Sequence, residues 1–309
     1  MIHNITLVGL GAMGSYFAPR LYATYGNHFA LLASGERAQR LKKQGIWVNG
    51  EQYIFPVVDS AMQAEDDLII IAVKDTGLNQ AIQDIRHRVG EKTQILCVMN
   101  GVESERIIAE VYGWEHVLYS FMRVSIVMKD YHVSYDPMVG TVHFGEKTNE
   151  VKSQRVKDIE EVFYRSNIPY RIDEDMIFAL WHKFMANVGE NMTCALLGIP
   201  YGVFRTNDHA NHIRTEAMKE VVAIANHLGI MIGKKEMEYQ DRLVTKIPFD
   251  NCPSTLQDIE NQRKTEVEMF SGHVCELGRQ YHIPTPMNEL LYHGIKVLED
   301  KYLSNICTK

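Results

Sequence analysis

The sequence predicts an α/β fold: an N-terminal, doubly wound parallel sheet followed by an all-helical C-terminal domain. Short apolar segments alternate with helical ones over the first 100 residues, and this alternation implies parallel strands with helices on both faces. The first apolar segment runs directly into a glycine-rich turn. Beyond about residue 173 the pattern is nearly all helical. The predicted domains are residues 1–170 and 171–309, and ligands of such an arrangement usually bind between domains, outside the carboxyl ends of the strands.

The N-terminal elements follow from apolar runs and from the residues that interrupt them. Four continuous apolar runs are typical of buried parallel strands: Ile5–Val8, Phe29–Ala33, Leu68–Val73 and Ile95–Met99. Helices are predicted over Ala12–Tyr25 and over Glu36–Gln44, where Gly45 provides a stop. Asn49-Gly50, between Trp47–Val48 and Tyr53–Phe55, predicts a tight hairpin.

The remaining elements change character along the chain. Residues 117–144 are rich in strand-forming residues, a helix is expected over Val151–Arg165, and Ile168–Arg171 would close the sheet. Helices with Gly and Pro between them are predicted thereafter, over Ile177–Leu197, His209–Leu228, Lys235–Thr245, Thr255–Tyr281 and Asn288–Tyr302.

Composition excludes several classes of protein. The 309 residues are 46 % apolar, and 32 basic against 39 acidic residues give a net charge of −7, which argues against nucleic-acid binding. Five cysteines without a C-x-x-C pair indicate free thiols in a reducing compartment: Cys97, Cys194, Cys252, Cys275 and Cys307. We expect no metal site, no membrane span and no signal peptide, and therefore a cytoplasmic protein.

The turn after the first strand fits the pattern G-x-G-x-x-G and consists of Gly9, Leu10, Gly11, Ala12, Met13 and Gly14. In this pattern the first glycine permits a tight turn, the second lets a pyrophosphate approach the backbone, and the third allows close helix–strand packing. Because the motif lies between a predicted strand and a predicted helix, it predicts dinucleotide binding. The alternative is a purely structural glycine turn.

The end of the second strand bears on which dinucleotide binds. An NAD enzyme often has an acidic residue there to hold the ribose hydroxyls, but this chain has Ser34. Ser34 leaves room for a 2′-phosphate, for which Arg37 or Arg40 would supply the charge. NADP(H) is therefore favoured over NAD(H), which is not excluded; the alternative is that both arginines belong to a solvated helix face.

Further motifs occur in a characteristic order: Val73-Lys74 and Met99-Asn100-Gly101 at strand ends, Lys183-x-x-x-Asn187-x-x-x-Asn191 on a helix, Ser254-Thr255-Leu256-Gln257-Asp258, and Thr265-Glu266. In this order and spacing the chain resembles the ketopantoate reductase (2-dehydropantoate 2-reductase) family, over almost its whole length. The resemblance implies a Rossmann-type domain followed by a helical domain, and NADPH-dependent reduction of the 2-oxo acid ketopantoate to pantoate in pantothenate biosynthesis.

The resemblance also implies roles for individual residues. Lys183 would be the general acid, and the substrate would be held by Asn100, Lys183, Asn187, Asn191, Asn251 and Ser254. The cofactor would contact the glycine turn together with Ser34, Arg37, Lys74, Asn100, Ser125 and Glu266. Two departures stand out: Ser34 replaces a family arginine, which bears on NADP preference, and Tyr201 replaces a family asparagine, which bears on the substrate.

The Lys183 motif makes chemical sense for a reductase. Hydride transfer to a ketone leaves an alkoxide that an acid must protonate, and a lysine can do so when burial or another cation lowers its pKa. Positions 183, 187 and 191 share one face of an α-helix, where one lysine and two amides favour a polar cleft over a core stripe. The alternative is a solvated helix face.

For each of the other motif residues, the alternative is a purely structural role. Lys74 would be a surface lysine, Asn100 a turn residue, Ser254 with Gln257 a capping box, and Glu266 a partner of Arg263 on the same helix. Three other functions remain open: a related reductase of another branched 2-oxo acid, a β-hydroxyacid dehydrogenase, and a dinucleotide-binding sensor without turnover. A small-molecule substrate is expected in the reductases, and a homodimer is plausible.

Overall fold

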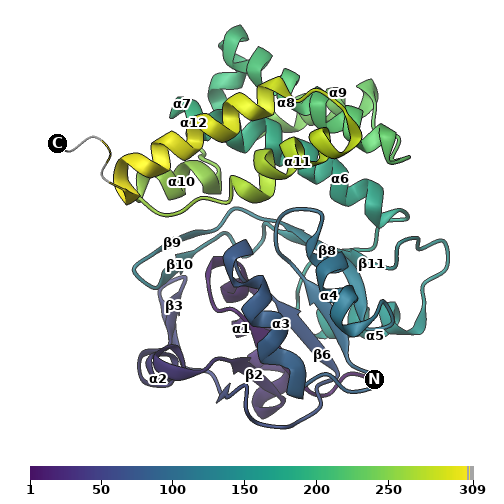
Figure 1. The fold of residues 1–309 in the computed structure, drawn as a ribbon. Coiled ribbons are helices and arrows are strands. Elements are labelled where there is room, and N and C mark those ends of the chain that lie inside the picture. The colour runs from purple at the N-terminus through teal and green to yellow at the C-terminus, as the bar shows by residue number, and fades with distance from the viewer. Residues whose placement is uncertain (305, 307–309) are drawn as a thin grey trace. The chain divides into compact units, whose positions relative to one another are not determined.

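A computed structural model describes residues 1–304 and 306, so the thiol of Cys307 lies outside the described residues. The chain divides into two compact units, residues 1–177 and 178–309 (Figure 1). The first unit contains all of the strands that the structure describes, and the second is helical. The predicted combination of a parallel-dominated α/β sheet with a helical C-terminal region is confirmed.

An eight-stranded sheet forms the centre of the first unit, in the order β12-β11-β8-β7-β6-β1-β2-β5. Every neighbouring pair is parallel except β8 with β11, which is antiparallel. The strands are β1 (Ile5–Val8), β2 (Phe29–Leu32), β5 (Val57–Val58), β6 (Leu68–Ile71), β7 (Gln94–Cys97), β8 (Val117–Arg123), β11 (Thr141–Gly145) and β12 (Tyr170–Arg171). The fully buried runs β1 and β6 pair residue for residue, from Ile5 with Leu68 to Val8 with Ile71, as their wholly apolar sequences require.

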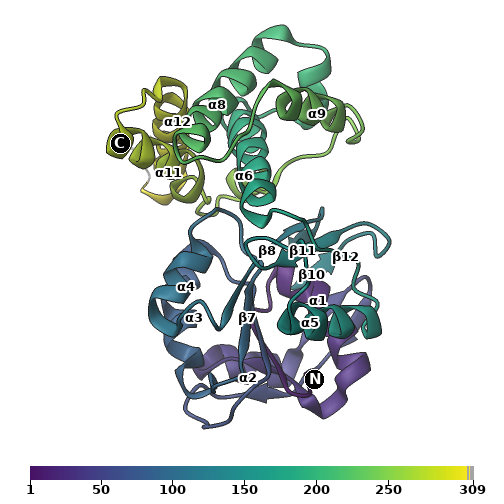
Figure 2. The same ribbon diagram turned by 90° about the vertical axis from the view of Figure 1, so that its right-hand side faces the viewer.

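Helices cover both faces of this sheet (Figure 2). Helices α3 (Leu78–Asp84) and α4 (Ser104–Tyr112) lie on one face, and α1 (Ala12–Tyr25) and α5 (Gln154–Arg165) on the other. On the α1 face, the Phe17 and Phe163 rings lie 6.2 Å apart and belong to one buried core. Because β2 and β6 lie on opposite sides of β1, the order in which strands are added to the sheet reverses at β1. Ligands of such sheets bind at this kind of switch point.

The predicted hairpin belongs to a second, smaller sheet of order β4-β3-β10-β9. Its strands are β3 (Ile46–Val48), β4 (Glu51–Tyr53), β9 (Val127–Lys129) and β10 (His132–Ser134), and it follows α2 (Gly35–Gln44) in the chain. Asn49 and Gly50 have φ angles of 50° and 87°, the left-handed values that a two-residue hairpin turn needs.

The C-terminal unit is helical as predicted, but two of its helices depart from the regular α-helices that the sequence predicts. The expected helix over Ile177–Leu197 is α6 (Met176–Ala186), a π-helical turn η4 (Asn187–Asn191) and α7 (Met192–Leu197). In place of one helix over Thr255–Tyr281 the structure has α10 (Ser254–Glu260), an irregular stretch, a π-helical turn η6 (Glu268–Gly272) and α11 (His273–Tyr281). The first prediction is confirmed in its extent, because residues 176–197 are helical throughout with a π-helical turn inside. The prediction of one continuous helix over Thr255–Tyr281 is wrong, because residues 261–267 are not helical.

Tertiary contacts lie at the π-helical turn and at the break. At η4, a Cβ on Gly189 would lie 2.3 Å from the Met218 side chain, so this turn is pressed closely against α8 (Asp208–His227). After α10, the buried Glu299 carboxylate accepts hydrogen bonds from both the backbone N–H and the hydroxyl of Thr265, at 2.7 and 2.6 Å. The unit is completed by η5 (Tyr201–Arg205), α9 (Lys234–Val244) and α12 (Pro286–Leu303). No helix among the described residues is long and apolar enough to cross a membrane.

Candidate active site

The glycine turn between β1 and α1 contains three glycines, which differ in how much room each has for a side chain. Gly9 has a φ of +98°, and a Cβ there would lie 2.5 Å from the Ala72 carbonyl oxygen. A Cβ on Gly14 would lie 1.9 Å from the Gly9 carbonyl oxygen, so α1 packs against the turn backbone. At Gly11 nothing lies within 4 Å of the added atom. The fold therefore needs the outer two glycines, whereas Gly11 borders open space.

The first turn of α1 suits an anion. Its N-cap residue, Gly11, offers no side chain to the helix, and no acidic residue lies in the first turn. The first N–H groups of a helix have no partner within it and carry a partial positive charge. The turn thus combines space with N–H donors, as a pyrophosphate requires.

Four of the predicted cofactor contacts gather at one edge of the sheet. Ala72 N–H donates to the Val8 carbonyl at 2.8 Å, and Val98 N–H to the Ile71 carbonyl at 3.0 Å, so the ends of β1, β6 and β7 are adjacent. Gly9, the exposed Lys74 and the half-buried Asn100 follow these three parallel strands. The exposed Ser125 follows β8, the next parallel strand.

The end of β2 is polar and basic. Ser34 lies at the N-cap of α2 but does not cap it; its hydroxyl pairs with that of Ser60 at 2.9 Å. The Arg40 guanidinium lies 4.0 Å from the centre of the Tyr131 ring, so a wholly solvated helix face does not describe it. The Arg37 side chain is exposed, but desolvation by its surroundings and the charge of Arg40 lower its pKa, against the opposing effect of Asp84. Ser34 and Arg37 are therefore available together at this strand end.

The Lys183 motif lies at the junction of α6 and η4. Lys183 in the last turn of α6 is 7 % exposed, Asn187 is half-buried, and Asn191 is 6 % exposed. This burial excludes the alternative of a solvated helix face. Because Asn187 to Asn191 form a π-helical turn, the regular α-helical rotation assumed from the sequence does not apply there. Insertions of this kind occur frequently at functional sites.

Asn251 and Ser254 flank Pro253 at the start of α10. Asn251 is fixed through its carbonyl, which accepts a hydrogen bond from Tyr201 N–H at 3.0 Å. Ser254 is exposed and is the first residue of the helix, where Pro253 takes the N-cap position. The capping-box interpretation is therefore wrong: the Gln257 side-chain amide donates instead to the Cys252 carbonyl at 2.9 Å.

Glu266 is half-buried in the irregular stretch between α10 and η6. The structure places it outside any helix, so the alternative of a pair with Arg263 along one helix is wrong in its premise. The Arg263 Nε atom donates to the Asp258 carboxylate at 3.0 Å. The N–H group of the neighbouring Thr265 donates a hydrogen bond to the Glu299 carboxylate, which fixes the backbone next to Glu266.

One structural feature beside the Lys183 motif was missed from the sequence. The Arg214 guanidinium, 1 % exposed, donates to the Glu190 carboxylate at 3.2 Å and also pairs with Asp241. The Gln240 amide donates to the same Glu190 oxygen at 2.9 Å. Because Glu190 precedes Asn191, this network connects the π-helical turn to α8, which carries Arg214, and to α9, which carries Gln240 and Asp241. Arg214 and Gln240 lie 24 and 50 residues from Glu190 in sequence, so no local sequence pattern predicts these contacts.

The comparisons with known proteins decide the family. Residues 5–149 match the family described as ketopantoate reductase PanE/ApbA, and residues 175–299 match its C-terminal part. The chain belongs to the ketopantoate reductase family. It is thus an oxidoreductase that acts on CH–OH groups, and nicotinamide dinucleotides are the cofactors of the family.

Individual members of the family match over nearly the full length of the chain. The 2-dehydropantoate 2-reductase of Aquifex aeolicus is 28 % identical over 308 residues, covering 97 % of this chain and 98 % of its own. That of Pyrococcus horikoshii is 26 % identical over 299 residues, covering 96 % and 97 %.

Solved structures share the fold at lower identity. A D-mandelate dehydrogenase with NADH and anilino(oxo)acetate superimposes with a TM-score of 0.86, at 22 % identity over 97 % of this chain and 99 % of its own. A dimeric ketopantoate reductase from Staphylococcus aureus gives a TM-score of 0.81, at 19 % identity over the same shares.

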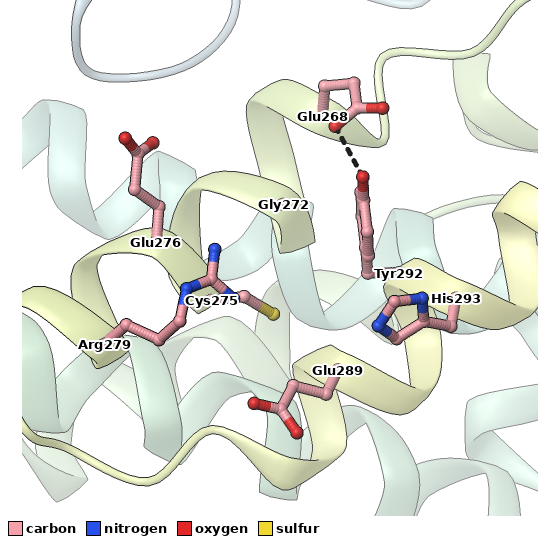
Figure 3. A pocket seen from close by; sticks show the side chains of 8 residues that line it. All are labelled: Glu268, Gly272, Cys275, Glu276, Arg279, Glu289, Tyr292 and His293. Carbon is pink, nitrogen blue, oxygen red and sulfur yellow. Dashed lines mark hydrogen bonds between the residues drawn. The ribbon is translucent and has the colours of Figure 1, made fainter.

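A hollow of about 520 Å³ lies elsewhere in the helical unit (Figure 3). Residues of η6 and α11 line one side and residues of α12 the other. Of the lining residues, Tyr292 donates to the Glu268 carboxylate at 2.9 Å. Lys296, which does not line the hollow, pairs with the same carboxylate at 3.0 Å. None of the predicted site residues, all of which are described, lines this hollow.

Proposed function

We propose that this protein reduces the 2-oxo group of 2-dehydropantoate to the hydroxyl of pantoate with NADPH, and that Lys183 is the general acid. The observation that carries the proposal is the buried Lys183, followed at four-residue spacing by two asparagines in a π-helical turn. The full-length similarity to 2-dehydropantoate 2-reductases supports the substrate. We further propose a homodimer, by analogy with the dimeric relative, and a cytoplasmic location, which agrees with the four free thiols of the described residues.

Each proposed role follows from the chemistry of the side chain. When bound, NADPH supplies the hydride. Lys183 then donates a proton to the oxygen of the former carbonyl, a step worth about 10²–10⁴-fold in rate. Lys74 and Lys183 provide the positive charge that a carboxylate substrate needs in a chain of net charge −7.

The neutral polar residues would bind and orient the ligands. Asn187, Asn191, Asn251 and Ser254 offer hydrogen bonds to the substrate, and Asn100 can donate to or accept from either ligand. Glu266 would accept hydrogen bonds from cofactor and substrate hydroxyls. Ser34, Arg37 and Ser125 complete the cofactor contacts.

The test is oxidation of NADPH and NADH, followed at 340 nm, with 2-dehydropantoate, 2-oxoisovalerate and 2-oxoisocaproate. We expect fast turnover of 2-dehydropantoate with NADPH. Turnover of another oxo acid in its place would refute the substrate, and cofactor binding without any turnover would refute the enzyme.

A second candidate is reduction of a different 2-oxo acid with NADH. Ser34 and Tyr201 are the departures that favour it, and the structural likeness to a D-mandelate dehydrogenase with NADH extends over nearly the whole chain. Phenylglyoxylate, the 2-oxo acid that corresponds to mandelate, therefore belongs in the same assay. Activity on it with NADH, and none on 2-dehydropantoate, would favour this candidate.

A further inference from the structure

Tyr201 occupies a position where the backbone is held tightly. Gly198 ends α7 in the left-handed conformation, with a φ of 65°, and reverses the chain toward η5. Tyr201 N–H then donates to the Asn251 carbonyl and Gly202 N–H to the Phe249 carbonyl, each at 3.0 Å. A Cβ on Gly202 would lie 2.3 Å from the Phe249 ring, so the two segments are in close contact. The backbone of Tyr201 is thereby fixed to the loop that carries Asn251.

The side chain of Tyr201 is also held at both ends. Its half-buried ring packs against an apolar cluster that includes Cys194, Phe204 and Val244. Its hydroxyl donates to the Asn191 side-chain oxygen at 2.9 Å. Tyr201 therefore connects two residues of the proposed substrate site, Asn191 through its side chain and Asn251 through its backbone.

This hydrogen bond determines which way the Asn191 amide faces. An amide is planar and carries its oxygen and its NH₂ group on opposite sides of one carbon. With the oxygen turned to Tyr201, the NH₂ group is turned away from it. Burial, with Glu190, Cys194 and Cys252 nearby, raises the pKa of the Tyr201 phenol, so its hydroxyl remains a donor at any physiological pH.

We propose that Tyr201 is a positioning residue that presents the Asn191 NH₂ group to the bound 2-oxo acid, so that this subsite accepts only a hydrogen-bond acceptor such as a carboxylate oxygen. The inference rests on the proposed function and deepens it. An asparagine at position 201, as in the family pattern, has a shorter side chain and lacks the aromatic ring.

The first experiment compares Tyr201→Phe with the wild-type protein in steady-state kinetics. Losing one hydrogen bond that orients a binding group should raise KM for the oxo acid about three- to tenfold. We expect kcat to stay within about twofold and the Kd for NADPH to be unchanged, because Tyr201 orients a substrate-binding group only. The matched control is Tyr302→Phe, which removes a hydroxyl that donates at 2.8 Å to the Arg263 carbonyl, in the same unit.

A double-mutant cycle with Asn191→Ala tests whether the effect passes through Asn191. Once Asn191 is absent, Tyr201→Phe should change KM less than twofold. Additive losses, or a Tyr201→Phe protein that behaves like the Tyr302→Phe control, would overturn the inference while leaving the proposed function intact. Absence of wild-type turnover on every 2-oxo acid would overturn the proposed function, and the inference with it.

Discussion

A Gly11→Val substitution is expected to abolish dinucleotide binding without unfolding the protein. Gly11 has φ −104° and ψ −156°, an extended conformation open to valine, and a Cβ there meets nothing within 4 Å. The cost of losing a glycine N-cap and the gain from a less flexible unfolded chain are each below about 1 kcal/mol, and they oppose each other. The valine methyl groups, however, would fill the space that the pyrophosphate needs.

The magnitude follows from the contacts that would be lost. Hydrogen bonds from N–H groups to a charged phosphate are worth about 1.5–3 kcal/mol each, so even two lost bonds raise Kd at least 100-fold. Gly14→Ala is the contrasting variant, because its Cβ would lie 1.9 Å from the Gly9 oxygen. That overlap costs about 1–3 kcal/mol or more and should lower Tm of the cofactor-free protein by several degrees.

The assay pairs a titration with NADPH, followed by nicotinamide fluorescence, with thermal unfolding of the cofactor-free proteins. We expect the Gly11→Val protein to keep the wild-type Tm and to lose NADPH binding. Wild-type affinity in that protein would refute the assignment of Gly11 to the phosphate site. A large fall in its Tm would refute the claim that the fold does not need this glycine.

Three further outcomes are expected. Lys183→Ala should lower kcat about 10²–10⁴-fold with the Kd for NADPH unchanged, and unaltered turnover would count against Lys183 as the acid. Arg37→Ala should raise KM for NADPH about tenfold or more but leave KM for NADH unchanged; equal effects on both would argue against a 2′-phosphate contact. Burial would raise the pKa of Asp173, but the hydrogen bond from His143 at 2.5 Å and the charge of Arg171 lower it overall. The ionised carboxylate therefore stabilises the fold above about pH 4. The Tm difference between wild type and Asp173→Asn should shrink as the pH falls below that value. A constant Tm difference from about pH 3 to pH 8 would contradict this assignment.

Much of the first unit could be predicted because its signals are local. The helix predicted over Ala12–Tyr25 has those bounds in the structure, and the Asn49-Gly50 turn forms where expected. Both depend on residues within a few positions of each other: a glycine turn that leads into a helix, and two residues that accept positive φ angles. The spacing of Lys183, Asn187 and Asn191 likewise placed the three on adjoining helical turns.

The C-terminal unit was predicted less well, because its helices are interrupted by distant contacts. The π-helical turn at Asn187–Asn191 lies against α8, and the break before Glu266 follows the bond between Thr265 and Glu299, 34 residues away. A helical pattern is the same whether or not such a partner exists. Sequence reasoning therefore missed the break after Glu260 and the π-helical turn at Asn187–Asn191.

The sequence by itself determined the strands, the glycine turn, the family and the residue types available for catalysis, since each depends on neighbours in the chain or on a motif. Only the tertiary structure decided the order of the strands, which glycines the fold requires, and the burial of Lys183 and Asn191. The hydrogen bond from Tyr201 to Asn191 was likewise decided only by the tertiary structure. The physical reason is that burial and hydrogen-bond direction depend on which surfaces meet after folding, and those surfaces come from distant parts of the chain.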